Sequence, residues 1–339
     1  IRYRVDSIAP SISAVAPANN CFVNSSPTSI VINYHEAGSG LNIENSTRSI
    51  QDGNQGEVAG TWSDSDGNQL TFTPAAALAE SSYTIALQLV DSLGNQGAAA
   101  QYDFTVDTTP PPAPQLHPVT SPTHNPTQEV TGTKEAYAAI LVNGQQAVDH
   151  TPSTDWQHTL NLATGSNQFT FVAKDRAENQ SEGISTGILF DDIPPPPVNT
   201  LTLNGQGDGT TADLNWTGYD ETGHGDIAFY RIYADTAAFS DVSGITPHST
   251  TAAGHLFATV QNLARNTTYW FAVIAVDAVG NAQSTVNPVS GAPLDIVPPE
   301  DIANLQAQSF ADRLVFTWNH SANAAGDLAG YRIFFGDDN

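Results

Sequence analysis

Four short proline-containing segments divide this chain, and each of them begins with an aspartate. They share the pattern Asp-x-x-[Ala/Pro]-Pro and begin at Asp6, Asp107, Asp191 and Asp295, at intervals of 101, 84 and 104 residues. Proline fixes φ and lacks an amide donor, so a strand cannot continue through such a segment, and an extended, stiff connector remains. The four segments therefore predict domain boundaries.

These boundaries predict three complete domains and the first part of a fourth. We expect the end of a preceding domain at residues 1–6, domains at 7–106, 107–191 and 192–295, and an incomplete domain at 296–339. About 100 residues are enough for a two-sheet core. Methionine is absent, even at position 1, so we expect the chain to begin inside a longer polypeptide and to stop inside one.

The charge balance is strongly acidic although charged residues are scarce. They make up 13% of the chain, the formal net charge at pH 7 is −25, and only Lys134 and Lys174 are lysines. Such a chain cannot neutralise a run of phosphates, which argues against nucleic acid and disfavours anionic membrane surfaces as partners. The single cysteine, Cys21, excludes an intrachain disulfide, and no apolar run is long enough for a membrane helix. The balance suits a self-repelling surface protein or one whose carboxylates bind cations.

Short alternating runs of apolar and polar residues dominate the chain, and helical periodicity is almost missing. Gly, Asn, Asp and Pro separate the runs, which is typical of all-β proteins. Tight hairpin turns are predicted at Asp66-Gly-Asn68 and Asn143-Gly144. The predicted strands are residues 11–16, 29–34, 57–63, 69–73, 83–90 and 98–106, then 127–133, 138–142, 155–162, 167–173 and 184–189, then 201–204, 212–217, 229–234, 256–261, 269–276 and 286–294.

The third domain and the C-terminal segment repeat one another. Leu214-Asn-Trp216 corresponds to Phe316-Thr-Trp318, and residues 225–233 correspond to residues 326–334. The segment is therefore a second copy of the third domain's plan that stops early. Because it lacks the later strands, we expect it to expose apolar side chains.

A five-residue motif occurs once in each complete domain, after an apolar strand and before the last one. It begins at Asp91, Asp175 and Asp277 and ends in asparagine four residues later. Asp and Asn at the ends of a short turn hydrogen-bond to the local backbone and tolerate left-handed geometry. The motif therefore predicts a hairpin loop.

Residues 193–294 resemble a fibronectin type III domain. The resemblance rests on Trp216 in the second strand and on Leu263-Ala-Arg-Asn-Thr-Thr-Tyr269, which is similar to the tyrosine corner of that fold. Residues 297–339 resemble the first half of another such domain. The resemblance implies that Trp216 is buried and that Tyr269 hydrogen-bonds to the backbone near Leu263.

The first two domains resemble bacterial Ig-like repeats of large exported surface proteins, such as adhesins and Rhs-type stalk regions. Residues 7–106 carry Gly60-Thr-Trp-Ser63 and the Asp91 motif, and residues 108–190 carry Gly132-Thr-Lys-Glu135 and the Asp175 motif. Together, these resemblances imply an all-β chain of tandem Ig-like and fibronectin type III β-sandwiches in an extended rod. They also imply a bacterial, extracellular or cell-surface setting.

The linker aspartates are candidate calcium ligands. In large bacterial adhesins, similar Ig-like repeats bind calcium at their junctions, so the resemblance implies a site that joins a linker aspartate to a loop of a neighbouring domain. Ca²⁺ takes roughly six to eight oxygen ligands, and the sequence does not show where the others originate. The alternative is that each aspartate only caps a strand end before proline. The candidates are Asp6, Asp107, Asp191, Asp192 and Asp295.

Catalytic motifs are missing from the sequence. It contains no His-Glu-x-x-His, no Gly-x-Ser-x-Gly and no Cys-x-x-Cys-His, so we expect no enzymatic activity and no cofactor other than calcium. Trp156 and Trp270 are the aromatic candidates for a binding face, whereas Trp216 and Trp318 are expected in the core.

Two functions remain open. The first is a structural or adhesive stalk segment that spaces or presents other domains and assembles into a filament if its ends pair with other copies. The second is a carbohydrate- or protein-binding module accessory to an exported enzyme. The partners implied are other domains of the same polypeptide, other copies of the chain, and cell-surface protein or glycan; neither nucleic acid nor membrane insertion is expected.

Overall fold

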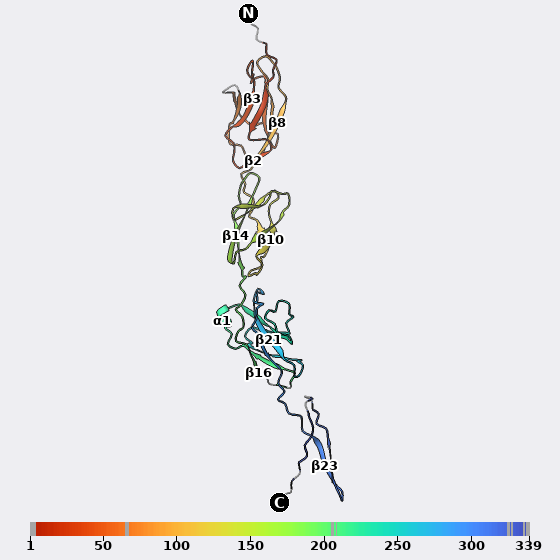
Figure 1. Ribbon diagram of the computed structural model, residues 1–339. Coiled ribbons are helices and arrows are strands. Elements are labelled where there is room, and N and C mark those ends of the chain that lie inside the picture. The colour runs from red at the N-terminus through yellow and green to blue at the C-terminus, as the bar shows by residue number, and fades with distance from the viewer. Residues whose placement is uncertain are drawn as a thin grey trace. The chain divides into compact units, whose positions relative to one another are not determined.

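A computed structural model describes residues 5–64, 68–204, 207, 209–323, 326, 328–334 and 336. The turn predicted at Asp66 and Gly67 and most of residues 1–5 lie outside the described residues. The chain forms two compact units. One consists of Ile1–Ser121 and Pro126–Phe190, and the other of Pro122–Asn125 and Asp191–Asn339. The first unit carries two β-sandwiches and the second carries one, together with a separate hairpin; the sandwiches are here called modules (Figure 1).

The first module contains two four-stranded sheets around one core. Strand β7 shows why these residues form strands, since Tyr83, Ile85 and Leu87 alternate inward and are buried. Strand β2 pairs in parallel with β8, whereas the other pairs are antiparallel. One sheet has the order β1 (Ser11–Ala16), β3 (Ile30–His35), β6 (Gln69–Pro74), β5 (Gly60–Asp64), and the other β2 (Cys21–Val23), β8 (Ala100–Val106), β7 (Ser81–Gln88), β4 (Thr47–Asp52).

The second module packs a three-stranded sheet against a four-stranded sheet. Val130, Trp156 and Leu160 face Ile140 and Phe171 across the core. Asn143 and Gly144 have positive φ angles of 49° and 81°, so the predicted Asn-Gly hairpin turn is confirmed. The sheets have the orders β13 (Asp155–Asn161), β10 (Thr127–Thr133), β9 (Gln115–Leu116) and β12 (Gln145–Val148), β11 (Ala139–Val142), β14 (Gly165–Lys174), β15 (Ile184–Phe190).

The third module has the same three-plus-four arrangement. Trp216 is fully buried, and the hydroxyl of Tyr269 accepts a 3.0 Å hydrogen bond from the amide of Ala264, so both expectations of a fibronectin type III core are confirmed. A single helical turn, α1 (Glu221–His224), precedes β18. The sheets have the orders β16 (Thr202–Asn204), β17 (Ala212–Asn215), β20 (Phe257–Val260) and β19 (Ser249–Ala252), β18 (Ile227–Asp235), β21 (Tyr269–Asp277), β22 (Val289–Gly291).

The C-terminal segment contributes one hairpin, β23 (Ala303–Ser309) with β24 (Leu314–Asn319). Trp318 and Tyr331 stack edge to face at 5.4 Å, as Trp216 and Tyr230 do at 5.3 Å. The internal repeat therefore has a structural counterpart. Leu314 is 60% exposed, which agrees with the apolar exposure predicted for an incomplete sandwich.

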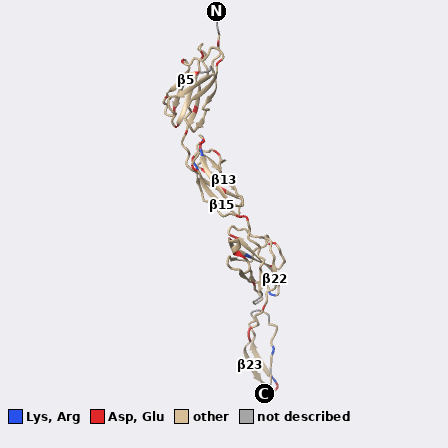
Figure 2. Cartoon of the chain, turned by 90° about the vertical axis from the view of Figure 1, so that its left-hand side faces the viewer, with Lys and Arg blue, Asp and Glu red and all other residues tan. Residues whose placement is uncertain are grey.

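The predicted fold class is confirmed, because strand accounts for 46% of the chain and helix for 1%. In the described residues, no helix is both long enough and apolar enough to cross a bilayer. The chain has 35 Asp and Glu residues against 10 Lys and Arg, and acidic positions occur in every module (Figure 2).

Candidate functional site at the domain linkers

Each linker aspartate closes the same small turn. One carboxylate oxygen accepts a hydrogen bond from the amide two residues later, which is the capping role that the sequence offered as the alternative to metal. This turn uses only Oδ1 and leaves Oδ2 available to other partners. The four bonds run from Ile8 to Asp6 (3.0 Å), Thr109 to Asp107 (3.2 Å), Ile193 to Asp191 (3.1 Å) and Val297 to Asp295 (3.2 Å).

The five-residue loops fold around their first aspartate. In the third module, Oδ1 of Asp277 accepts the amides of Val279, Gly280 and Asn281 at 2.7–2.9 Å, and Oδ2 accepts Nδ2 of Asn281 at 2.9 Å. Asp91 makes the same bonds to Leu93 and Asn95, and Asp175 to Asn179. The carboxylates of Asp91 and Asp277 are thus buried but satisfied, at 0% and 1% exposure.

The asparagine of each loop also binds the linker in front of its own module. We call this contact the Asn–linker bond. In all three modules the loop asparagine donates a hydrogen bond from Nδ2 to the backbone carbonyl of the linker aspartate, which fixes the start of the module to its last loop. The bonds are Asn95 to Asp6 (3.1 Å), Asn179 to Asp107 (2.8 Å) and Asn281 to Asp191 (2.9 Å).

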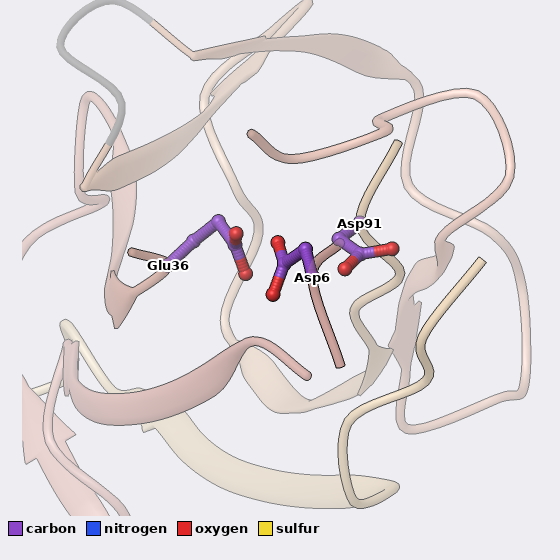
Figure 3. Close-up of side chains that lie close together, drawn as sticks. All are labelled: Asp6, Glu36 and Asp91. Atoms are coloured by element: carbon purple, nitrogen blue, oxygen red, sulfur yellow. The ribbon is translucent and has the colours of Figure 1, made fainter. Parts of the chain in front are cut away.

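In the first module, this arrangement brings three carboxylates together, which we call the first trio. Asp6, Glu36 and Asp91 each offer an oxygen within 4.8 Å of the others, and Figure 3 shows Asp6 between the other two. Oε1 of Glu36 accepts the amides of Gly38 and Ser39, whereas Oε2 is buried and has no hydrogen-bond partner among the described residues.

Hydrogen bonds keep two members of the first trio ionised. The amide of Ile8 lowers the pKa of Asp6, with further help from Ser39. Burial raises the pKa of Asp91, but hydrogen bonds from Asn95 and Leu93 more than offset this and leave it below the ordinary value. Negative charges therefore lie side by side here at neutral pH, which is costly unless a cation joins them.

The third module has a second trio, made of Asp191, Asp226 and Asp277. Burial raises the pKa of Asp226, and the charges of Asp277 and Asp191 raise it further against the opposing effect of His224. Nε2 of His224 lies 3.4 Å from Oδ1 of Asp226. This trio therefore combines a linker, a loop and the residue before β18.

The second module lacks such a trio among the residues that the structure describes. Burial raises the pKa of Asp107, and the charge of Asp175 adds to this. At the corresponding end of the module, Glu135 is exposed and Lys134 is buried, with Nζ donating to the carbonyls of Glu135, Thr151 and Ser153. Burial lowers the pKa of Lys134.

The structure thus separates the five predicted ligands. Asp6 and Asp191 lie in trios, whereas Asp107, Asp192 and Asp295 lie in neither. The motif had marked Asp91 and Asp277, but only as turn residues. Glu36 carried no signal, because it lies outside every repeat and far from the linkers in sequence. Asp226 lies in the repeat of residues 225–233 with 326–334, but that repeat indicated a shared fold and not a ligand.

The two tryptophans proposed for a binding face behave differently. Trp156 is only 4% exposed, packs on Phe171 at 5.5 Å and donates from Nε1 to the carbonyl of Thr133, so its assignment to a binding face was wrong. Trp270 is half-buried on the outer face of β21. That face is not open, because a second apolar cluster with Val242 and Val286 covers Ala272 and Ile274.

The Asp175 loop contains a strained position that the other two loops avoid. Gly94 and Gly280 have φ angles of 90° and 100°, and Glu178 takes their place with φ 73°. A side chain disfavours this region, so Glu178→Gly should stabilise the second module by about 1 kcal/mol, after loss of the exposed Lys174–Glu178 pair. Hydrogen exchange of core amides in the second module measures this.

The matched control is Gly280→Ala, which should destabilise the third module by about 1 kcal/mol. A neutral or destabilising Glu178→Gly would mean that the ion pair outweighs the backbone strain.

A family model of known proteins matches the first module. Residues 6–108 match the family model described as a bacterial Ig-like domain, which confirms the resemblance seen in the sequence. The chain matches none of the curated protein sequences.

Solved structures similar to the chain include single domains and tandem arrays. Domains A168–A170 of titin share 15% identity over 84% of this chain and 99% of theirs, with a TM-score of 0.38. The fibronectin(III)-like modules of Clostridium thermocellum CbhA share 15% identity over 54% of this chain and 94% of theirs, at 0.35. CopC from Methylosinus trichosporium OB3b shares 24% identity over 29% of this chain and 93% of its own, at 0.26.

Proposed function

We propose that this chain is a non-catalytic stalk segment of an exported bacterial surface protein, where it spaces or presents other domains of the same polypeptide. The observation that carries the proposal is the Asn–linker bond, which recurs in all three complete modules. A stalk must control the direction in which one module leaves the next, and this bond fixes each linker to the module that follows. The bacterial Ig-like match of the first module supports a surface setting.

We further propose that calcium binds at the two trios and stiffens the linkers there. Each trio supplies three carboxylates, one of which belongs to a linker. Oε2 of Glu36 is buried and has no hydrogen-bond partner among the described residues. Oδ1 of Asp226 is also buried and has no hydrogen bond there, only the 3.4 Å ion pair with Nε2 of His224, so both oxygens are suited to bind a cation. Hard oxygen donors of this kind suit Ca²⁺, with dissociation constants on the order of 10⁻⁴–10⁻³ M in extracellular modules.

Small-angle X-ray scattering of the whole chain tests both proposals. In calcium, we expect an extended particle with a maximum dimension above about 100 Å, from module lengths of roughly 30–40 Å each. Chelator should shorten the maximum dimension, because the linkers at the trios lose a cross-link. Titration calorimetry on the same samples should show two calcium sites.

The double variant Glu36→Gln, Asp226→Asn should scatter in calcium as the native chain does in chelator. Asp192→Asn removes a linker carboxylate outside both trios, and the difference between its profiles in calcium and in chelator should equal that of the native chain. Identical profiles with and without calcium would leave the linker aspartates as turn residues only, and a compact particle would contradict the stalk itself.

A further inference from the structure

The linker between the first two modules is held from both sides. On the first module, the carbonyl of Val23 accepts the amide of Asp107 at 3.0 Å, and Oε2 of Glu80 accepts the hydroxyls of Thr108 and Thr109 at 3.0 and 2.8 Å. On the second module, Asn179 holds the carbonyl of Asp107. These bonds fix the path of the linker. None of them joins a side chain of one module directly to a side chain of the other.

Arg176 supplies that contact. It follows Asp175 in the loop of the second module, and its guanidinium carbon lies 3.9 Å from the ring centroid of Tyr137 in the same module. The same carbon lies 5.4 Å from the ring centroid of Phe22, in strand β2 of the first module. A guanidinium stacks well on aromatic faces, so one side chain links the two modules.

The backbone beside Arg176 is held in an unfavourable conformation that presents one of these rings. Tyr137 has φ 62°, a left-handed conformation that bulky residues avoid. Its amide donates to the carbonyl of Thr151 at 2.6 Å, which holds the turn. Such a conformation at an exposed tyrosine indicates that the position of the ring has a role.

The other two loops have no arginine at the position of Arg176. Ser92 and Ala278 occupy the position of Arg176, and neither can stack on an aromatic ring. Their linkers instead adjoin the carboxylate trios, and no such trio is found at the second module among the described residues. The chain therefore shows two different solutions at equivalent places.

We propose that Arg176 locks the second module onto the first by stacking between Phe22 and Tyr137, so that this junction needs no metal ion. The contrast with the other linkers rests on the calcium sites proposed above. The lock itself stands on the Arg176 geometry and holds whether or not calcium binds elsewhere.

Distances between spin labels on the whole chain test the lock. Labels at Ser63→Cys in the first module and Thr159→Cys in the second, in a Cys21→Ser background, report the relative position of the modules; both sites are exposed. The native junction should give one narrow distance distribution, unchanged by chelator. Arg176→Ala should broaden it, because losing the exposed cation–π contact with Phe22 shifts the docking equilibrium roughly two- to fivefold.

Two further variants keep the test decisive. Phe22→Leu removes only the ring on the first module and should broaden the distribution like Arg176→Ala. Arg231→Ala removes an arginine that stacks on Phe229 inside the third module and should leave it unchanged. A distribution that stays narrow in both Arg176→Ala and Phe22→Leu overturns the lock, and broadening of the native distribution by chelator overturns its independence from metal. Failure of the calcium proposal would instead appear only in the scattering and calorimetry.

Discussion

Replacing Trp216 by alanine should lower the free energy of unfolding of the third module by about 3–5 kcal/mol. The indole is fully buried between the two sheets and packs edge to face on Tyr230 at a centroid distance of 5.3 Å. Tyr219 also packs edge to face on Tyr230, at 5.9 Å, so removal of the indole leaves a cavity that rigid aromatic neighbours cannot fill. Hydrogen exchange of the amides in β18 and β21, measured on the whole chain, reports the loss in this module alone.

Trp270→Ala is the matched control, because it deletes the same side chain from the same module at a half-buried position. We expect it to cost less than about 2 kcal/mol, since little of the cavity would be enclosed. Equal costs at the two positions would show that Trp216 is not the centre of the core and would remove the main support for a fibronectin type III assignment.

The strands with the strongest apolar alternation were predictable from the sequence. The predicted runs at residues 11–16 and 127–133 coincide with β1 and β10, and that at 269–276 differs from β21 by one residue. In β10, Val130 and Gly132 are buried, and in β21 Phe271, Val273 and Ala275 lie in the core, so burial and sequence pattern agree in these two strands. In β1, only Ile12 and Val15 pack against the core, on either side of a bulge. Trp156 was predictable in the same way, because its spacing from Leu160 places both on the inner face of β13.

The strands that were missed lie at sheet edges, where alternation carries little information. β4 (Thr-Arg-Ser-Ile-Gln-Asp) buries only Ile50, β19 (Ser-Thr-Thr-Ala) buries nothing fully, and β2 has three residues. Such strands form because a neighbour offers unpaired backbone groups, not because their own side chains demand burial. β2 is also parallel to β8, a pairing that no local pattern indicates.

Of the candidate site, only the residues that recur in the sequence were predictable. The linker aspartates and the loop motifs recur in sequence, so both were visible, and the structure joins them through the Asn–linker bond. The third carboxylate of each trio was not visible. Glu36 directly follows β3 and Asp226 directly precedes β18, so the two have no common spacing from the linker aspartate or from the loop motif. Only the folded chain shows that each of them lies beside a linker aspartate and a loop aspartate.

In calcium, replacing Asp277 by alanine should lower the free energy of unfolding of the third module by about 3–5 kcal/mol, because three backbone amides and Nδ2 of Asn281 lose a charged acceptor. The Asn–linker bond to Asp191 should weaken as well, since Asp277 orients Asn281. In chelator, the cost should be smaller. Two carboxylates whose oxygens lie within 4.8 Å of each other repel by at least about 3 kcal/mol at an effective dielectric constant of 20, and the substitution relieves that repulsion.

Asp175→Ala separates the two effects, because Asp175 holds Asn179 through the same kind of bonds but belongs to no trio among the described residues. Its cost, read from core amides of the second module, should be the same in calcium and in chelator. If the cost of Asp277→Ala were equally insensitive to calcium, the trio would hold no cation, and the loop aspartates would serve only to orient the asparagines that bind the linkers. If chelator reduced the loss in free energy of unfolding for Asp277→Ala but not for Asp175→Ala, the carboxylate of Asp277 would be shown both to hold the loop and to bind the ion.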